Sequence, residues 1–414
     1  MQQEKPALFG GPKTKTVPYG SGKRFGNEEL KELKEALEQN TLFYWYGKKV
    51  KSFTKEFAEM YGTNYCVATS SGTAAIHVAL GALGVGPGDE VITSPITDIG
   101  TVIGILFQNA IPVFADLDPN TYNLDPASVE DKITDHTKAI IVVHLAGNSA
   151  DMDPLMEIAR RHNIKIIEDC AQSYLTYYKG KLTGTIGDIG CFSLNDFKTI
   201  SAGDGGMLIM NDKQLYQRAF RFTDKNYSRL PDAGAVRDVT FLAPNYRMNE
   251  LTGAVGLAQL KKLKRICGRR NLYGEKISAG IQDLPGIEIP KVIEGCRSSY
   301  WFYMFRIDES QAGVGRDQFS DALAAEGIQC SRGYIPDCIY RYDLFANRNA
   351  YDSTNCPFNC PYTKNQASYE KGLCPTAEKI LKTSIKMPVS EFFTDQDAED
   401  VIRAIHKVAD YYRK

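Results

Sequence analysis

Two short apolar runs, KAIIVVHL (residues 138–145) and IKIIEDC (residues 164–170), decide the fold class of this chain. Each is apolar along most of its length rather than at alternate positions, which is typical of strands buried on both faces of a parallel sheet. The runs DEVITSP (89–95) and IPVFAD (111–116) precede them with the same character. Helical or turn-rich connectors separate these runs. Helices between such strands predict a three-layer α/β domain with a mostly parallel sheet.

Helical patterns surround these runs. Residues 28–40 place Leu30, Leu33 and Leu37 on one face, residues 73–83 form an apolar helix closed by Gly84, and residues 251–271 form a long helical stretch. The pattern then changes to a smaller α+β arrangement, with a strand over residues 300–307 and helices over residues 319–328 and 397–414. At about 150 residues per domain, we predict a large domain over residues 1–265 and a small C-terminal domain over residues 266–414.

Composition narrows the function classes. The net charge of −1 gives no electrostatic case for binding nucleic acid or an anionic membrane. No apolar run approaches the ~20 residues that span a bilayer, and the first residues have no apolar signal segment, so we expect a cytoplasmic protein. A zinc site at Cys356, Cys360 and Cys374 would need a fourth ligand, and no nearby histidine supplies one. We therefore expect reduced thiols and no metal.

Three sets of polar residues follow strand-like runs, where open α/β sheets bind ligands. Ser71, Gly72 and Thr73 open a helix, so backbone amides and the helix dipole there favour a phosphate. A plain helix cap is the alternative, since serine and threonine also favour that position. Asp169 ends the run IKIIED, and a buried carboxylate needs a cation or donors. It could instead cap the next helix.

The third set surrounds Lys198 in FSLNDFKTISAGDGG (192–206). A lysine that forms Schiff bases must reach a carbonyl and lose its proton near neutral pH. Gly203, Gly205 and Gly206 would let the backbone turn tightly beside a bulky cofactor. Most lysines are simply exposed to solvent. The combination matters more, because a phosphate cup, a buried aspartate and a later lysine are the parts that a pyridoxal phosphate site needs.

Several ordered motifs run along the chain: SSGTAAIHVALGALGVGPGDEVI (70–92), VHLAGNSADMD (143–153), IEDCAQS (167–173), GTIGDIGCFSLNDFK (184–198), GDGG (203–206) and APNYRMNELTGAVG (243–256). In these motifs the chain resembles the DegT/DnrJ/EryC1/StrS family of fold-type-I aminotransferases, which act on keto-sugars and keto-cyclitols. Within that family, the stretches GLCPTAE and CPYTK are most similar to glutamine-dependent aminotransferases of scyllo-inosose-type cyclitols.

The resemblance implies two catalytic residues. Lys198 would carry pyridoxal 5′-phosphate as an internal aldimine and then move protons as base and acid, while Asp169 would keep the ring nitrogen protonated. Gln172 would contact the ring hydroxyl side. The resemblance further implies that the phosphate is held by Ser71, Gly72, Thr73 and Ser193, and by Asn245 of the neighbouring subunit in a homodimer with shared sites.

Two positions depart from the family pattern. The family usually carries an aromatic residue that stacks on the cofactor ring after the threonine of the segment that here reads SPITDIG, and that position is Asp98. We interpret Asp98 as facing the substrate side of the ring and helping to select the acceptor. In GYIPDCIYRYDLF, Tyr334 remains but the histidine of many sugar-nucleotide members does not.

The leading function is ping-pong transamination from glutamine or glutamate to a keto-sugar or keto-cyclitol. A sugar dehydratase of the same fold is an alternative, although a histidine replaces the lysine in those family members and this chain keeps Lys198. A non-catalytic regulatory or binding module is a second alternative. It would not need the lysine, the aspartate and the phosphate cup together.

Overall fold

A computed structural model describes residues 4–229, 237–352, 354–364 and 367–413. A seven-stranded sheet has the order β1-β9-β8-β5-β4-β2-β3. Strands β8, β5, β4, β2 and β3 pair in parallel, and β9 is antiparallel to both neighbours, which confirms the mostly parallel sheet. Its strands are β1 (Tyr65–Thr69), β2 (Glu90–Thr93), β3 (Ile111–Phe114), β4 (Thr137–Val143), β5 (Lys165–Asp169), β8 (Ile189–Ser193) and β9 (Gly206–Met210).

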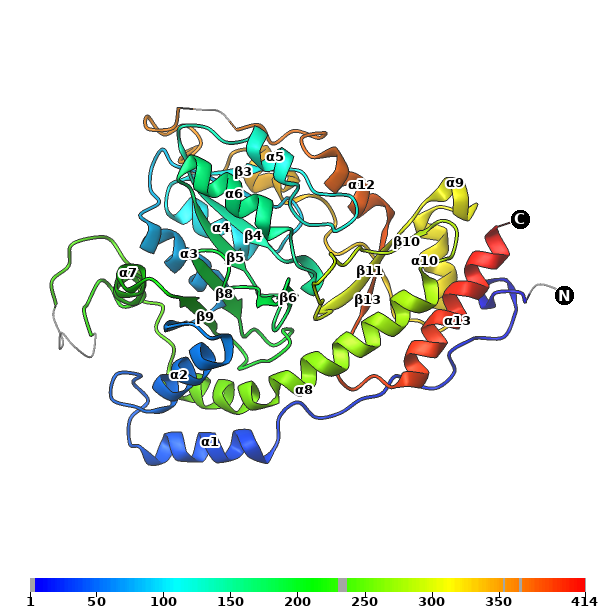
Figure 1. The fold of residues 1–414 in the computed structure, drawn as a ribbon, viewed down its shortest axis with the longest axis horizontal. Coiled ribbons are helices and arrows are strands. Elements are labelled where there is room, and N and C mark those ends of the chain that lie inside the picture. Colours follow the sequence, from blue (N-terminus) through cyan, green and yellow to red (C-terminus); the bar gives the residue numbers. More distant parts are fainter. Residues whose placement is uncertain (1–3, 230–236, 353, 365–366, 414) are drawn as a thin grey trace.

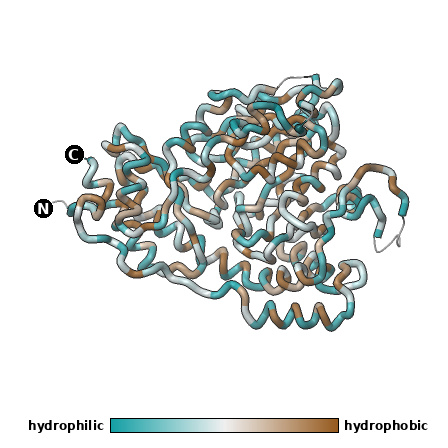
Figure 2. Tube along the Cα trace, turned by 180° about the vertical axis from the view of Figure 1, so that it is seen from behind, coloured by the Kyte–Doolittle hydropathy of each residue, from teal (hydrophilic) through white to brown (hydrophobic). Residues whose placement is uncertain are grey.

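Helices cover both faces of this sheet (Figure 1). Along β9, Met207 and Ile209 pack against α2 and α8, whereas Leu208 and Met210 pack in the cluster that contains α3. This alternation makes three layers, and Figure 2 shows hydrophobic segments concentrated in the middle of them. The helices are α2 (Lys49–Tyr61), α3 (Gly72–Leu83), α4 (Ile99–Phe107), α5 (Pro126–Asp131), α6 (Met152–His162), α7 (Lys213–Thr223) and α8 (Glu250–Ile281).

A smaller antiparallel sheet follows in the order β10-β11-β13-β12. It packs against α10 and α13 around its own apolar cluster, which includes Phe305, Phe319 and Ile405. The strand expected over residues 300–307 begins two residues later, at Phe302. The elements here are α9 (Glu309–Ala312), α10 (Arg316–Ala325), α13 (Asp395–Tyr412), β10 (Ile287–Glu288), β11 (Phe302–Ile307), β12 (Ser331–Arg332) and β13 (Ser384–Pro388).

Three segments connect the two sheets. Helix α8 runs without a break through residues 265 and 266, so the division proposed at that point lies inside a helix. The segment before α1 lies against the small domain, where Lys15 forms an ion pair with Asp397 of α13 at 2.6 Å. The segment after β12 lies against the large sheet, where the ring of Tyr340 packs against that of Phe114, with ring centroids 5.6 Å apart. The remaining short elements are η1 (Ala7–Phe9), η2 (Leu145–Gly147), η3 (Ile339–Arg341), β6 (Tyr177–Tyr178), β7 (Lys181–Leu182), α11 (Asp343–Ala346) and α12 (Pro375–Thr383).

Helix α1 (Asn27–Glu38) forms where the leucine pattern predicts it, yet two of its three leucines do not face the protein, and Leu33 is half-buried. Leu30 and Leu37 are 64% and 62% exposed, and α1 lies at the outer edge of the molecule (Figure 1). Glu29 and Glu32 are buried instead, because lysines on α2 and α8 pair with their carboxylates. The inward face of α1 is therefore held by ion pairs, and its apolar face is left uncovered.

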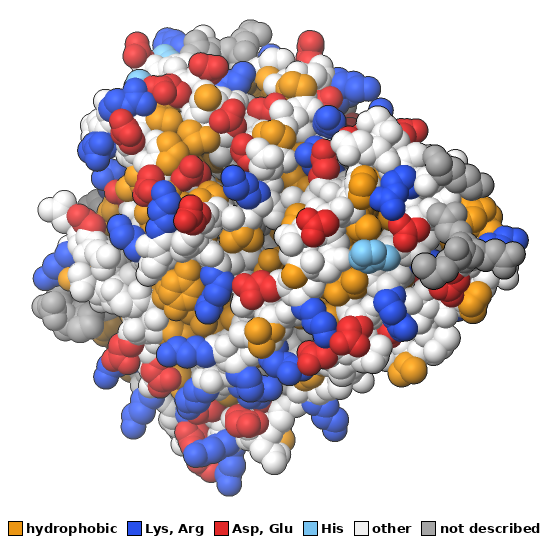
Figure 3. Space-filling view, turned by 45° about the vertical axis from the view of Figure 1, so that its right-hand side comes forward, with side chains coloured by type: hydrophobic (Ala, Val, Ile, Leu, Met, Phe, Trp, Pro, Cys, Tyr) orange, Lys and Arg blue, Asp and Glu red, His pale blue; other side chains and the backbone are white. Residues whose placement is uncertain are grey.

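On the face shown in Figure 3, basic and acidic side chains are interspersed, in line with the small net charge. Among the helices that the structure describes, none combines the length and apolar character needed to cross a bilayer.

Candidate active site

A cavity of about 260 Å³ lies beyond the ends of β5 and β8, where α3 and α4 begin. This is the edge at which ligands collect in open α/β sheets. Gln172 and Asn245 are not among the described residues that line it. The other seven predicted site residues are brought together in its lining: Ser71, Gly72, Thr73, Asp98, Asp169, Ser193 and Lys198.

The start of α3 has the features of both interpretations given to it. The Ser71 hydroxyl oxygen accepts a hydrogen bond from the Ala74 amide at 3.0 Å, so it is a true helix cap. The amides of Gly72 and Thr73 have no acceptor among the described residues and stay available to an anion. A Cβ at Gly72 would lie 2.6 Å from that of Ser193. Only glycine therefore allows this close approach.

Asp169 is buried at the end of β5. Its carboxylate accepts hydrogen bonds from the Thr101 hydroxyl at 2.7 Å and from the Ala171 amide at 3.0 Å. Burial raises the pKa of Asp169, although these two donors and the nearby Lys198 oppose that effect. No helix begins after β5, because residues 170–176 form turns. The alternative role as a helix cap is therefore wrong, and no cation of the described part of the chain is hydrogen-bonded to Asp169.

Lys198 lies in the segment after β8, half-buried, with its amine 4.1 Å from the centre of the Trp301 ring. Burial lowers the pKa of the Lys198 amine, and the charges of Asp169 and Asp98 oppose that effect. The interpretation as a freely solvated lysine does not fit this position. Gly203 and Gly205 have φ values of +84° and +141°, so the predicted tight turn does require glycine.

Gln172 is buried behind the cavity rather than in its wall. Its side-chain oxygen accepts a hydrogen bond from the Ala146 amide at 2.8 Å, and its amide group donates to the Tyr334 hydroxyl at 3.4 Å. Within one chain, Gln172 thus joins the loop after β4 to Tyr334. Its proposed contact with the cofactor ring stays a prediction.

Asn245 is exposed and lies in the segment between α7 and α8. Its backbone forms an isolated bridge with Asp224. The neighbouring Tyr246 carbonyl accepts a hydrogen bond from the Ser70 amide at 2.8 Å. Asn245 therefore does not line the cavity of its own chain, and a role in the cavity of a second chain stays a prediction.

Two residues of the site were not predicted from the sequence. Thr101 binds Asp169 from the first turn of α4, and its hydroxyl also lies 2.7 Å from that of Thr97. The indole of Trp301 lies over Lys198, and its N–H group donates to the Phe197 carbonyl at 2.9 Å. Thr101 is three residues after Asp98, and residues three apart lie on the same face of a helix. This spacing could have predicted that Thr101 also faces the site. Trp301 directly precedes β11 of the small sheet, and no local pattern places it here.

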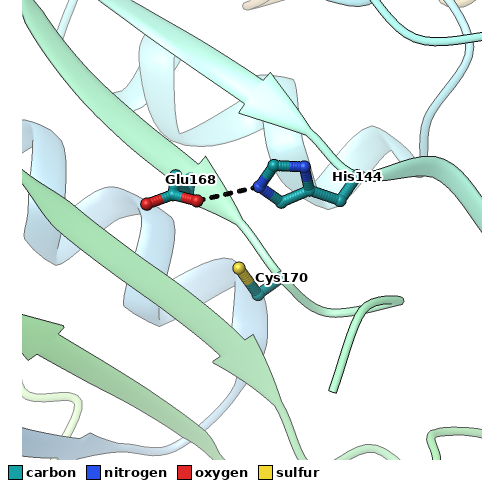
Figure 4. A group of neighbouring side chains, drawn as sticks. All are labelled: His144, Glu168 and Cys170. Carbon is teal, nitrogen blue, oxygen red and sulfur yellow. Dashed lines mark hydrogen bonds and ion pairs between the residues drawn. The ribbon is translucent and has the colours of Figure 1, made fainter. Parts of the chain in front are cut away.

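His144, Glu168 and Cys170 form a buried group beside Asp169 (Figure 4). The imidazole accepts the Ala150 amide at Nδ1, at 3.1 Å, so Nε2 carries the proton and donates to Glu168 at 3.0 Å. The Glu168 carboxylate also accepts three backbone amides from residues 184–187. These hydrogen bonds occupy both ring nitrogens of His144 and both carboxylate oxygens of Glu168, and they fix the turns around the end of β5.

Comparison with known proteins gives consistent matches over most of the chain. A sequence profile of the DegT/DnrJ/EryC1/StrS aminotransferase family matches residues 23–406. The spore coat polysaccharide biosynthesis protein SpsC of Bacillus subtilis is 35% identical over 401 residues, covering 95% of this chain and 97% of that protein. A putative L-glutamine:3-amino-2,3-dideoxy-scyllo-inosose aminotransferase of Streptoalloteichus tenebrarius is 36% identical over 347 residues, 82% of each chain. The X-ray structure of an aminotransferase from Psychrobacter cryohalolentis superposes with a TM-score of 0.82 at 28% identity, covering 96% and 100% of the two chains.

Proposed function

The chain belongs to the DegT/DnrJ/EryC1/StrS aminotransferase family, and on that premise we propose that it moves an amino group from glutamine or glutamate to a keto-cyclitol or keto-sugar. The family is one of pyridoxal-phosphate-dependent enzymes that includes aminotransferases and some dehydratases, and this chain is a pyridoxal-phosphate-dependent aminotransferase. The observation that supports the proposal most strongly is the cavity that holds Lys198 and Asp169 together. The glutamine-dependent inosose aminotransferase among its relatives supports the choice of donor and of acceptor class.

The residues of the cavity fit this cofactor. The amides of Gly72 and Thr73, together with the nearby Ser193, form a cup suited to a phosphate. Among the described residues, the hydrogen-bond donors to Asp169 are both neutral. A protonated pyridine nitrogen would supply the positive charge that a buried carboxylate requires. The Lys198 amine would be the group that bonds the cofactor aldehyde.

When bound, pyridoxal phosphate supplies an aldehyde that takes up amines and a ring that accepts an electron pair. Asp169 would keep the ring nitrogen protonated, because an opposite charge favours the charged form of a titrating group. Lys198 would hold the cofactor through its amine, and the same amine would be the base that takes a proton from the substrate carbon. Trp301, which covers the lysine, would limit access of water to that amine.

The pH dependence of cofactor loading reports on Lys198. Only a neutral amine attacks an aldehyde, and burial lowers the pKa of Lys198 from its ordinary value of 10.5. The rate of loading the apo protein with pyridoxal phosphate should therefore rise with pH and become constant below pH 10.5. Stopped-flow absorbance measures this rate, with N-acetyl-lysine as the comparison and Lys198→Ala as the blank. If the loading rate became constant only at the same pH as the reaction of N-acetyl-lysine, the result would argue against a lowered pKa for Lys198.

A direct assay tests the function. The loaded protein, given glutamine, is offered keto-cyclitols and nucleotide-linked keto-sugars as separate acceptors, and the aminated product is identified by mass spectrometry. We expect an aminated cyclitol or sugar together with the keto acid derived from glutamine. Loss of water from the acceptor without transfer of nitrogen would assign the chain to dehydration instead. Unchanged substrates and an unchanged cofactor spectrum would leave a binding module as the correct description.

A homodimer with shared sites is the proposed assembly, and a two-fold pair is the commonest closed arrangement. Two features support it. The leucines on the outer face of α1 are uncovered in the single chain, and such apolar faces are typical of interfaces. In addition, Asn245 does not line the cavity of its own chain, which leaves it available to the cavity of a second chain. Location in the cytoplasm stays a prediction from the sequence.

Subunit mixing tests the shared site. One chain carries Lys198→Ala and the other Asn245→Ala, and each homodimer is expected to be impaired. In a mixed dimer, one site receives both substitutions and the other receives neither. The turnover of each mixed dimer should therefore return toward about half of the turnover of a parent dimer. The measurement is turnover after subunit exchange, with heterodimers isolated by two different tags. If heterodimers form and activity does not return, Asn245 acts within its own chain or not at all.

A further inference from the structure

The turn that carries Lys198 is held by side chains from distant parts of the chain rather than by its own backbone. Arg24 donates hydrogen bonds to the carbonyls of residues 196, 198 and 199, and Trp301 donates to the carbonyl of Phe197 at 2.9 Å. Among the described residues, no backbone amide donates to any of these four consecutive carbonyls. Peptide carbonyls require donors, so these two side chains complete the hydrogen bonding of the turn.

The shape of the Arg24 guanidinium suits this task. Its Nη1 donates to the carbonyl of residue 196, and its Nη2 donates to the carbonyls of Lys198 and Thr199, the latter at 3.1 Å. These carbonyls lie before and after the Lys198 Cα in the chain. Because the guanidinium is planar and rigid, it fixes the distance between them. A lysine amine in the same place would be a single point of charge and would not span the turn.

The rest of the chain fixes Arg24 in turn. The buried Glu391 carboxylate lies 3.9 Å from its Nε. Arg270 of α8 binds that carboxylate from the other side, with Nη2 at 2.9 Å from Oε2. The backbone carbonyl of Arg24 accepts a hydrogen bond from the Gln259 side chain, also of α8, at 2.9 Å. The guanidinium is therefore placed by the protein itself, before a cofactor or a substrate binds.

These contacts join the turn to the small domain. Trp301 directly precedes β11, and Glu391 follows β13 of the same sheet. Arg270 also donates to the Trp301 carbonyl at 3.3 Å, so the two side chains that hold the turn share one neighbour. Arg24 comes from the segment before α1, which runs beside α8 (Figure 1). Segments from both ends of the chain thus meet at the turn that carries Lys198.

We propose that Arg24 is a positioning residue, which holds the Lys198 amine where it meets the cofactor aldehyde and the substrate carbon. Within the described chain, every hydrogen bond that its guanidinium donates goes to residues 196–199. Arg24 is not among the described residues that line the cavity, so it acts through the turn and not on the reacting atoms. The inference rests on the proposed function and deepens it.

The expected effect follows from the geometry. A misplacement of a reacting group by about 1 Å can lower a rate by about 100-fold. Loss of the guanidinium should therefore slow the steps that use the Lys198 amine by about 10- to 100-fold. Binding that does not involve this amine should not change, because the start of α3 and Asp169 do not contact Arg24.

Cofactor loading tests the proposal without turnover. Apo Arg24→Gln is mixed with pyridoxal phosphate, and formation of the visible band is followed by stopped flow. The rate should fall at least about tenfold from that of the parent. The affinity for pyridoxamine phosphate, which cannot bond to a lysine, should stay at the parental value. Arg24→Lys keeps the charge beside Glu391 but not the planar fork, so it should load slowly as well.

A matched control is Arg269→Gln. Arg269 is an exposed arginine of α8 that also donates to a backbone carbonyl, that of Phe393, away from the turn. This variant should load at the parental rate. Circular dichroism with a thermal melt checks the fold of each variant. If Arg24→Gln did not fold, Arg24→Lys, which keeps the ion pair, would decide the question.

A double-mutant cycle separates positioning from general damage to the fold. In Lys198→Ala, added methylamine would carry the proton, and its place does not depend on the turn. Arg24→Gln should therefore lower turnover about 10- to 100-fold in a chain that has Lys198, yet leave the methylamine-supported turnover of Lys198→Ala unchanged. An equal fall in both backgrounds would make the role of Arg24 merely structural and overturn the proposal.

Other results would overturn the proposal while transamination itself stands. These are a parental loading rate in Arg24→Gln or in Arg24→Lys, a loading rate that falls equally in Arg269→Gln, and an equal loss of affinity for pyridoxamine phosphate. If methylamine supports no turnover, the loading rates alone decide. Failure of the glutamine half-reaction in the parent would instead reject the proposed function, and the loading rates would still report on Arg24.

Discussion

Replacing Lys198 by alanine should reduce transamination by roughly 10⁴-fold or more, because it removes both the covalent attachment and the acid–base group. The Lys198 amine is the only cation in the described lining of the cavity, so no neighbour is placed to replace it. The protein should stay folded, since alanine removes a half-buried side chain from a segment outside the helices and strands. Turnover is followed by formation of the aminated acceptor, and a thermal melt checks the fold.

A matched control is Lys213→Ala, which removes an exposed lysine at the start of α7. That variant should retain parental turnover. Added methylamine should restore part of the activity of Lys198→Ala, because a free amine can carry the proton without being attached to the chain. Near-parental turnover of Lys198→Ala without any added amine would show that another group does this chemistry.

Asp169→Asn should lower turnover by roughly 10³-fold, because the ring nitrogen loses the charge that keeps it protonated. Asparagine preserves the shape and can still accept the hydrogen bond from the Ala171 amide, so the cofactor should remain bound. The half-reaction with glutamine, followed in a single turnover by absorbance, isolates this step. Asp169→Ala with nearly parental turnover would assign the role of electron sink to other residues.

The same substitution has an opposite effect on the apo protein. Burial raises the folded-state pKa of Asp169, so above that pKa the folded chain holds a disfavoured charge. Neutral asparagine removes this charge, and the melting temperature of the apo protein at neutral pH should rise while turnover falls. A melting temperature that falls as steeply as turnover would indicate a merely structural role.

Strands and the two catalytic candidates were predictable because their signals are local. Four apolar runs became β2, β3, β4 and β5, since strands buried on both faces require apolar residues along most of their length. Asp169 was identifiable because a charge directly after such a run is buried by the strand that carries it. Lys198 was identifiable only together with the phosphate cup and Asp169, which the topology brings to one edge.

Other features depend on contacts that no local pattern encodes. The leucines of α1 predicted an amphipathic helix, but its direction is set by distant lysines that pair with Glu29 and Glu32. Trp301, just before β11, lies over Lys198 from a segment about 100 residues further along the chain. Asn245 has no contact with the cavity in one chain, so its role was available only from the family resemblance.

The central claim is that Lys198 bonds the cofactor, and reduction with borohydride tests it most directly. The protein is loaded with pyridoxal phosphate, treated with borohydride to make the carbon–nitrogen bond permanent, digested, and mapped by mass spectrometry. We predict that the cofactor mass is found on Lys198 within the peptide that contains residues 192–206, and that the visible absorption band disappears on reduction. The cofactor mass on a different lysine, or its absence from the chain after the band has been reduced, would contradict the account.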